Sequence, residues 1–276
     1  MYDFDEITPA LDELWRVIGD HLRMGGVPDV PVSLERVMAY NETWSDPTLL
    51  LGQSCGLPIV DQLDGLVRVV GAFAVESASG GGVGDFGAAT YSSALVVHRD
   101  AAIGGLGGLP WSRGVSVAIN GWDSLSGFVS FGAACAIAID AGALDCEAAF
   151  GSVLVTGAHV RSLAAVGDGS ADLACIDGHT LALLTRHRPE AVEHVRVIQR
   201  GPTIPCVPLI TNLSTTPEEV ALLREALSAA ASDPDLGSAR SALGITGFVA
   251  LDNDAYEPVR AFHDTAKRFF ARGLSF

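Results

Sequence analysis

Two segments of the chain each run from a β-branched stretch into a polar helix start, and they constrain the fold most. The first covers residues 115–128 (VSVAINGWDSLSGF), and the second covers residues 152–163 (SVLVTGAHVRSL). In each, a run typical of a buried strand stops at small polar residues, and an amphipathic stretch begins. The first turn of a helix carries free N–H groups and a partial positive charge, which suits an oxyanion. The pattern therefore predicts two strand–helix units whose helix starts face one anion-binding cleft.

The rest of the chain continues this alternation of strands and helices. Further strands are expected at residues 49–52, 66–75, 91–97, 171–177 and 195–199, and helices at 8–24, 34–40, 180–186, 217–231 and 261–272. A glycine-rich loop is expected at residues 77–87, and the proline-punctuated stretch 202–208 reads as a linker. Strands that alternate with helices predict an α/β fold with mainly parallel sheets.

The order of these elements indicates two domains. Residues 94–199 form a β-α-β-α-β-α-β series that looks inserted, as domain II, into a discontinuous domain I of residues 1–93 and 200–276. Ligands of open α/β sheets bind beyond the carboxyl ends of the strands. Polar residues follow such ends after Leu51, Asn120, Val155 and Ile176. This coincidence predicts a ligand cleft between two flanked sheets.

Composition limits the classes of partner. The 276 residues are 49% hydrophobic, enough for a well-packed globular protein, and the net charge of −16 disfavours nucleic acid and anionic membranes. No apolar run approaches the ~20 residues of a membrane span, so no membrane insertion is expected. The five cysteines lack a C-x-x-C spacing, which favours buried reduced thiols over a disulfide framework.

The strongest candidate ligand contacts lie at the two helix starts. Ser124 and Ser126 precede Gly127, and capping alone would explain only one serine. Thr156 is either a plain helix cap or an anion contact. His159 is expected in a first helical turn, where the helix dipole lowers its pKa and leaves a neutral donor.

Five further polar residues are candidate ligand contacts. Asp177 ends a hydrophobic strand and either caps the next helix or faces the cleft. Gln53 and Ser54 form a polar loop after a buried strand, and Tyr91 begins a strand that could line the cleft wall. Asn120 ends the first of the two opening strands.

Catalytic, cofactor and metal motifs are weak. The glycine pattern at residues 82–87 precedes a strand and opens no helix, unlike a dinucleotide-binding turn. Nothing in the sequence brings Cys55 to His159 and Asp177 as a catalytic set. We expect no catalytic residue, no cofactor and no metal.

Taken together, five segments in order resemble a known family. They are LGQSCGLP at 51–58, YSSALVV at 91–97, Asn120 with SLSG at 124–127, TGAH at 156–159 and GSADLACID at 169–177. They are similar to the phosphate/phosphite/phosphonate-binding proteins of ABC transporters, which have the type 2 periplasmic-binding-protein fold. The resemblance covers residues 46–250.

The resemblance implies a non-enzymatic, monomeric binding protein with two α/β domains joined by a double crossover. It implies that Ser124, Ser126 and the backbone near Gly127 hold a small oxyanion and that His159 adds a donor. Tyr91 and Gln53 would be wall contacts, and Asp177 would meet the amine of an aminophosphonate. The implied partners are an ABC permease and its ATPase.

The chain departs from the family pattern at three places. Leu125 interrupts the serine pair, Leu57 replaces a common aromatic residue, and the family's opening strand is missing before the first helix. The resemblance implies a periplasmic protein, but the start has no signal-peptide pattern, which indicates the cytoplasm if Met1 is the true start. A cytoplasmic enzyme or ligand sensor on the same fold, acting on a phosphorylated or anionic metabolite, stays an open alternative.

Overall fold

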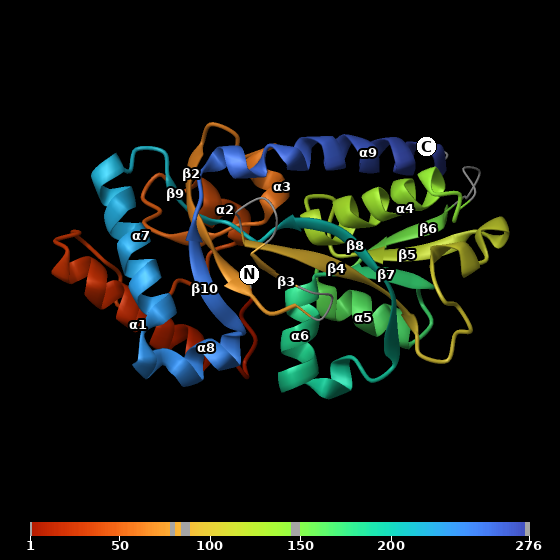
Figure 1. Ribbon diagram of the computed structural model, residues 1–276, viewed down its shortest axis with the longest axis horizontal. Helices are drawn as coiled ribbons and strands as arrows, with labels where there is room; N and C mark the ends of the chain where they lie inside the picture. Colours follow the sequence, from red (N-terminus) through yellow and green to blue (C-terminus); the bar gives the residue numbers. More distant parts are fainter. Residues whose placement is uncertain (1, 78–80, 84–88, 145–149, 274–276) are drawn as a thin grey trace. The chain divides into compact units, whose positions relative to one another are not determined.

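The chain folds into two compact units (Figure 1), and the computed structural model describes residues 2–77, 81–83, 89–144 and 150–273. Unit 1 comprises Met1–Glu76, Gly81–Thr90 and Pro205–Glu257. Unit 2 comprises Ser77–Gly80, Tyr91–Ile204 and Pro258–Phe276. Most of the loop expected at 77–87, and Cys146, lie outside the described residues.

The sheet of unit 1 has four strands in the order β1-β9-β2-β10. Its strands are β1 (Gly52–Gln53), β2 (Val67–Val75), β9 (Leu209–Asn212) and β10 (Ile245–Ala250). All three neighbouring pairs are antiparallel, so the expectation of a mainly parallel sheet is wrong for this unit. The physical reason is that β9 and β10, which the sequence pattern did not reveal, run opposite to the strands from the first part of the chain.

Five helices belong to the described part of unit 1. They are α1 (Thr8–Met24), α2 (Tyr40–Ser45), α3 (Gly56–Ile59), α7 (Pro217–Ser232) and α8 (Gly237–Leu243). The expected helix at 8–24 is confirmed as α1, which buries Leu14, Trp15, Ile18 and Leu22 at helical spacing. The expected helix at 217–231 is confirmed as α7, and Thr216 and Glu219 form its capping box.

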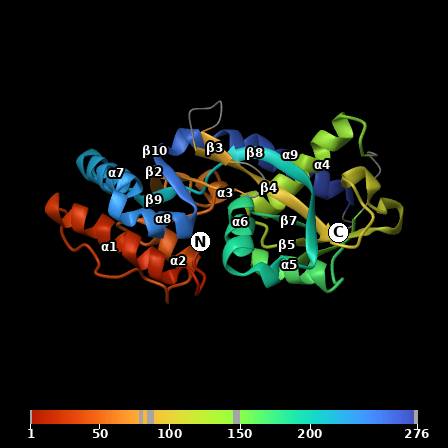
Figure 2. The same cartoon turned by 60° about the horizontal axis from the view of Figure 1, so that its bottom comes forward.

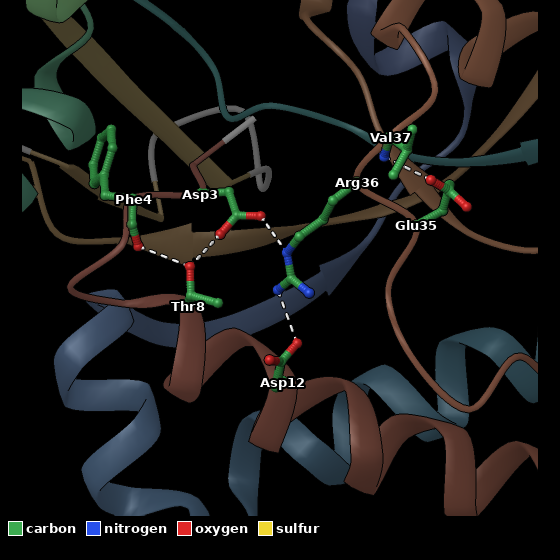
Figure 3. A network of polar contacts seen from close by, with 7 residues as sticks. All are labelled: Asp3, Phe4, Thr8, Asp12, Glu35, Arg36 and Val37. Carbon is green, nitrogen blue, oxygen red and sulfur yellow. Dashed lines mark hydrogen bonds and ion pairs between the residues drawn. The ribbon is translucent and has the colours of Figure 1, made fainter.

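The helix expected at residues 34–40 is absent. The carboxylate of Glu35 instead accepts hydrogen bonds from the backbone N–H groups of Val37 and Met38. Arg36 pairs with Asp3 at 2.6 Å and with Asp12 at 2.8 Å, which ties this segment to the start of α1 (Figure 3). Val37 is 95% exposed, so a helix here would have no apolar face to bury.

The second sheet has six strands in the order β3-β4-β7-β5-β6, with β8 paired to β4. The strands are β3 (Gly81–Val83), β4 (Ala89–His98), β5 (Val115–Ile119), β6 (Phe150–Val155), β7 (Leu173–Ile176) and β8 (Val195–Pro205). β5 runs parallel to β6 and β7, whereas β4 is antiparallel to β7. β8 continues to Pro205, so part of the expected linker is a strand.

The helices of unit 2 cover both faces of this sheet. They are α4 (Ser130–Asp140), α5 (His159–Gly167), α6 (Gly178–His187) and α9 (Pro258–Gly273), with the π-helix η3 (Leu125–Val129) ahead of α4. Short 3₁₀ turns of this unit are η1 (Leu106–Gly108), η2 (Trp111–Arg113) and η4 (Pro189–Ala191), whereas η5 (Pro234–Leu236) and η6 (Asn253–Tyr256) belong to unit 1. Figures 1 and 2 both show α4 and α9 on one face and α5 on the other.

The C-terminal helix α9 packs in unit 2, whereas the sequence placed the tail in domain I. A Cβ on Gly132 of α4 would lie only 2.6 Å from the Cα of Ala266, so the two helix backbones approach closely. The ring of Phe131 lies 6.1 Å from Phe269 and 5.9 Å from Phe270. This apolar contact explains why the last helix joins unit 2.

Three properties of the described residues bear on function. Their helices include none that is both long and apolar enough to cross a membrane. Within the same ranges, no cluster of three or more His, Cys, Asp or Glu residues could hold a metal ion. Cys55, Cys135, Cys175 and Cys206 are buried and in the reduced, thiol form, as expected for these four.

Candidate functional site

The first predicted helix start is a π-helical turn. Ser124 is the N-cap of η3, and its Oγ accepts a hydrogen bond of 2.9 Å from the N–H of Gly127. The N–H of Val129 donates to the carbonyl oxygen of Ser124 at 3.1 Å, five residues back, which gives the turn its extra width. π-helical turns are rare and are frequent at functional sites. The strand–turn–helix predicted from residues 115–128 is therefore confirmed.

Ser126 connects this turn to the second helix start. Its Oγ lies 3.0 Å from Nε2 of His159 and 3.4 Å from Oγ of Ser124. Both serines are 3% exposed, so their hydroxyls are held in place by their surroundings. The structure thus brings together three of the residues predicted to hold an oxyanion.

His159 is the first residue of α5 and provides a neutral polar group. Burial lowers the pKa of His159 below its ordinary value of 6.5, and the nearby charge of Asp177 offsets part of that effect. The ring is therefore uncharged at neutral pH. Its Nδ1 atom is buried and has no hydrogen-bond partner among the described residues. Buried polar atoms in native proteins are nearly always hydrogen-bonded, so the unpartnered Nδ1 sets His159 apart from an ordinary core histidine.

Asn120 and Gly127 lie against each other at the end of β5. The Oδ1 atom of Asn120 is buried without a hydrogen-bond partner in the described part of the chain. A Cβ on Gly127 would lie 2.0 Å from that oxygen, so only glycine lets the Asn120 side chain come this close to the backbone. The predicted site residues Asn120 and Gly127 therefore form one side of the turn that carries Ser126.

The hydroxyl of Thr156 orders the turn before His159. Its Oγ1 lies 3.1 Å from the carbonyl oxygens of Ile119 and Ala158 and 2.7 Å from Oγ of Ser162. These contacts fasten the end of β6 to the end of β5. Because the N-cap of α5 is Ala158 and no side chain caps this helix, the expectation of Thr156 as a plain helix cap is wrong. The contacts support a positioning role for Thr156, and direct ligand contact stays a prediction.

Asp177 caps α6, one of the two roles that the sequence left open. Its Oδ1 accepts a hydrogen bond of 2.7 Å from the N–H of Thr180, and the residue is 2% exposed. Because the same carboxylate acts on the pKa of His159, its charge also belongs to the electrostatics of this site. Contact with a ligand amine stays a prediction.

The other predicted contacts are buried or lie in unit 1. Tyr91 in β4 is 2% exposed. The carbonyl oxygen of Gln53 accepts a hydrogen bond of 2.9 Å from Nε1 of Trp44. Ser54 is fully buried, and its N–H donates to the carbonyl oxygen of Pro208 at 3.0 Å. Their roles toward a ligand remain predictions.

Sequence reasoning missed two residues that border this site. The Sγ of Cys175 in β7 donates to the carbonyl oxygen of Ser126 at 3.2 Å, which braces the π-helical turn from below. Arg161 lies in the first turn of α5, beside Gly157. A cation in the first turn of a helix is electrostatically unfavourable. This unusual placement is the sequence signal that could have identified Arg161.

Solved structures show the same fold. A binding protein component of an ABC phosphonate transporter from Pseudomonas aeruginosa is 20% identical, with a TM-score of 0.71, over 98% of this chain and 86% of that chain. PhnD1 from Prochlorococcus marinus, solved with methylphosphonate, is 12% identical, with a TM-score of 0.67, over 94% of each chain. A Xanthomonas citri protein solved with ATP is 18% identical, with a TM-score of 0.62, over 96% of each chain.

These likenesses confirm the predicted type 2 periplasmic-binding-protein fold. A search of curated proteins found no relative. A family model described as "ABC transporter, phosphonate, periplasmic substrate-binding protein" matches residues 65–256, well over half of the chain. Proteins of this family bind substrates for transporters and are not enzymes. The chain therefore belongs to the family of phosphonate periplasmic substrate-binding proteins of ABC transporters.

Proposed function

We propose that this protein captures a small phosphorus oxyanion, namely phosphate, phosphite or a phosphonate, and releases it unchanged. The observation that carries the proposal is the 3.0 Å contact between Ser126 Oγ and His159 Nε2, which joins two helix starts in unit 2. Hydroxyls, a neutral imidazole and first-turn N–H groups are all suited to oxyanion oxygens. Gln53, Ser54 and Tyr91 stay predicted contacts because of the motifs that contain them.

The charge of the site favours a ligand that can also donate a hydrogen bond. Asp177 is buried and negatively charged beside a histidine that is neutral at pH 7. A carboxylate accepts hydrogen bonds, so it favours a protonated phosphorus oxyanion or an aminophosphonate over a fully ionised anion.

The proposed role is delivery of this ligand, as a monomer in the periplasm, to an ABC permease and its ATPase. The family's periplasmic setting and the ligands of two solved relatives support it, since methylphosphonate and ATP both carry phosphorus–oxygen anions. An enzymatic role on the same fold is less favoured, because the family consists of transporter binding proteins.

A calorimetric panel tests the proposal. Phosphate, phosphite, methylphosphonate, 2-aminoethylphosphonate and sulfate are titrated into the protein and into the Ser126→Ala variant. A ligand at 100 times its Kd should stabilise the fold by about 2.7 kcal/mol, which a thermal shift detects independently. Ser112→Ala is the matched control, because Ser112 is an exposed serine of the same unit. If no phosphorus oxyanion binds, the proposed ligand class is wrong.

A further inference from the structure

Arg161 turns its charged group back over the start of its own helix. It is the third residue of α5, and a Cβ on Gly157 would lie 2.7 Å from its Nη2 and 3.4 Å from its Cζ. Helical side chains lean toward the helix N-terminus, which explains the direction. Gly157 has φ of +80° and no side chain, so it accommodates the guanidinium. The guanidinium therefore borders the turn that leads directly into His159.

The positive charge of Arg161 is not paired with a carboxylate of the described residues. Among the described residues, no carboxylate oxygen lies within 4.0 Å of the Arg161 guanidinium, and none accepts a hydrogen bond from it. The N-cap residue of α5, Ala158, offers no side-chain cap, and the first turn contains no acidic residue. A cation among the uncapped N–H groups of a first turn opposes the helix dipole. The arrangement lowers the stability of α5 unless an anion is present.

The turns next to Gly157 also contain polar atoms without a hydrogen-bond partner. The buried Nδ1 of His159 and Oδ1 of Asn120 have no hydrogen-bond partner in the described ranges. Thr156, which precedes Gly157, is bonded through its N–H to the carbonyl oxygen of Ile119 at 2.8 Å, next to Asn120. Arg161 is therefore built onto the turn that joins the end of β6 to the proposed oxyanion site.

We propose that Arg161 selects ligands that carry a second negatively charged group beside the phosphorus oxyanion. The inference rests on the proposed function and specifies the ligand class as short phosphonocarboxylates and diphosphonates. Ser124, Ser126 and His159 hold the first oxyanion with neutral donors. The planar guanidinium matches the two oxygens of a carboxylate or phosphonate, which a neutral donor set cannot do.

An isosteric ligand pair tests this assignment. Phosphonoacetate and phosphonoacetamide differ in one carboxylate, which the amide replaces at nearly constant size. A hydrogen bond between charged groups contributes about 1.5–3 kcal/mol, so the protein should bind phosphonoacetate roughly 10- to 100-fold more tightly than the amide. In Arg161→Gln this ratio should fall to about 1, while the Kd for phosphonoacetamide changes by less than about threefold.

Controls separate this inference from the proposed function. Arg113→Gln removes the same charge from another exposed arginine of unit 2 and should keep the wild-type ratio. The melting temperature of ligand-free Arg161→Gln should equal or exceed that of the wild type, because an unfavourable charge leaves the helix start. The role of Arg161 is overturned if the wild type does not prefer phosphonoacetate, or if Arg161→Gln keeps the wild-type ratio of affinities for phosphonoacetate and phosphonoacetamide. In either case, binding of methylphosphonate would still support the proposed function. If the wild type binds none of these ligands, both fail.

Discussion

The Nε2 atom of His159 lies 3.0 Å from the Oγ atom of Ser126, and this one contact joins the start of α5 to the start of η3. The two residues are 33 positions apart in sequence and come from different strand–helix units. Because both side chains are fixed by their surroundings, a bound oxyanion would meet donors that already have their final orientation. Pre-oriented donors lose little entropy on binding.

Ser126→Ala should weaken the binding of phosphorus oxyanions by roughly one to two orders of magnitude, since a hydrogen bond to a charged group contributes about 1.5–3 kcal/mol. The free energy of unfolding should also fall by about 1 kcal/mol, because Nε2 of His159 loses a partner. Calorimetry gives the affinity and urea titration gives the stability. Unchanged affinity in this variant would place the oxyanion elsewhere.

The pKa of His159 should give the fold a pH-dependent stability. Burial lowers the native pKa below 6.5, so between 6.5 and that native value the unfolded chain binds a proton that the folded chain does not. The free energy of unfolding should therefore fall as pH drops below 6.5, by at most about 1.4 kcal/mol per pH unit. Urea titrations at pH 7.5 and 5.5 should show a smaller loss for His159→Gln than for the wild type. His194→Gln, at an exposed histidine of the same unit, should keep the full loss.

Gly127→Ala should destabilise the protein by about 1–3 kcal/mol, because the new Cβ meets Oδ1 of Asn120 at 2.0 Å. Shortening the opposing side chain in an Asn120→Ala/Gly127→Ala double variant should restore much of the stability. Chemical denaturation measures both. Gly237→Ala is the control, since a Cβ there meets nothing within 4 Å. A double variant no more stable than Gly127→Ala would contradict the predicted clash.

Two substitutions at Asp177 should separate its structural role from its electrostatic one. Asp177→Ala removes the cap of α6 and should cost about 0.5–2 kcal/mol of stability, whereas Asp177→Asn keeps a good cap. Asp177→Asn should weaken 2-aminoethylphosphonate and spare or strengthen methylphosphonate, because it removes a negative charge. Calorimetry with the two ligands is the measurement. Equal losses for both would exclude selective contact with the amine.

The sequence predicts much of the local structure around the site. β5, η3, β6 and α5 fall where β-branched runs meet small polar residues, because strand propensity and the capping of η3 by Ser124 are local properties. The contact of Ser126 with His159 and the approach of Asn120 to Gly127 depend on tertiary packing. No spacing in the sequence gives such distances.

The errors have identifiable physical causes. β9 follows a proline-rich stretch, and β10 is short, contains Gly247 and is only partly buried, so neither shows a clear strand pattern. Because both pair antiparallel, missing them also gave the wrong sheet type for unit 1. The sequence shows the apolar face of α9, but it does not show that this face packs against α4.

The position of α9 determines when unit 2 can be completed during synthesis. Phe269 and Phe270 of α9, far along the chain from Phe131 of α4, pack against it, so this part of the core closes only after α9 has been translated. Until then α4 presents Gly132 and its neighbouring apolar surface without the helix that covers it. During synthesis, unit 2 therefore exposes the apolar surface of α4 until α9 packs on it, and a variant that lacks α9 would keep that surface exposed.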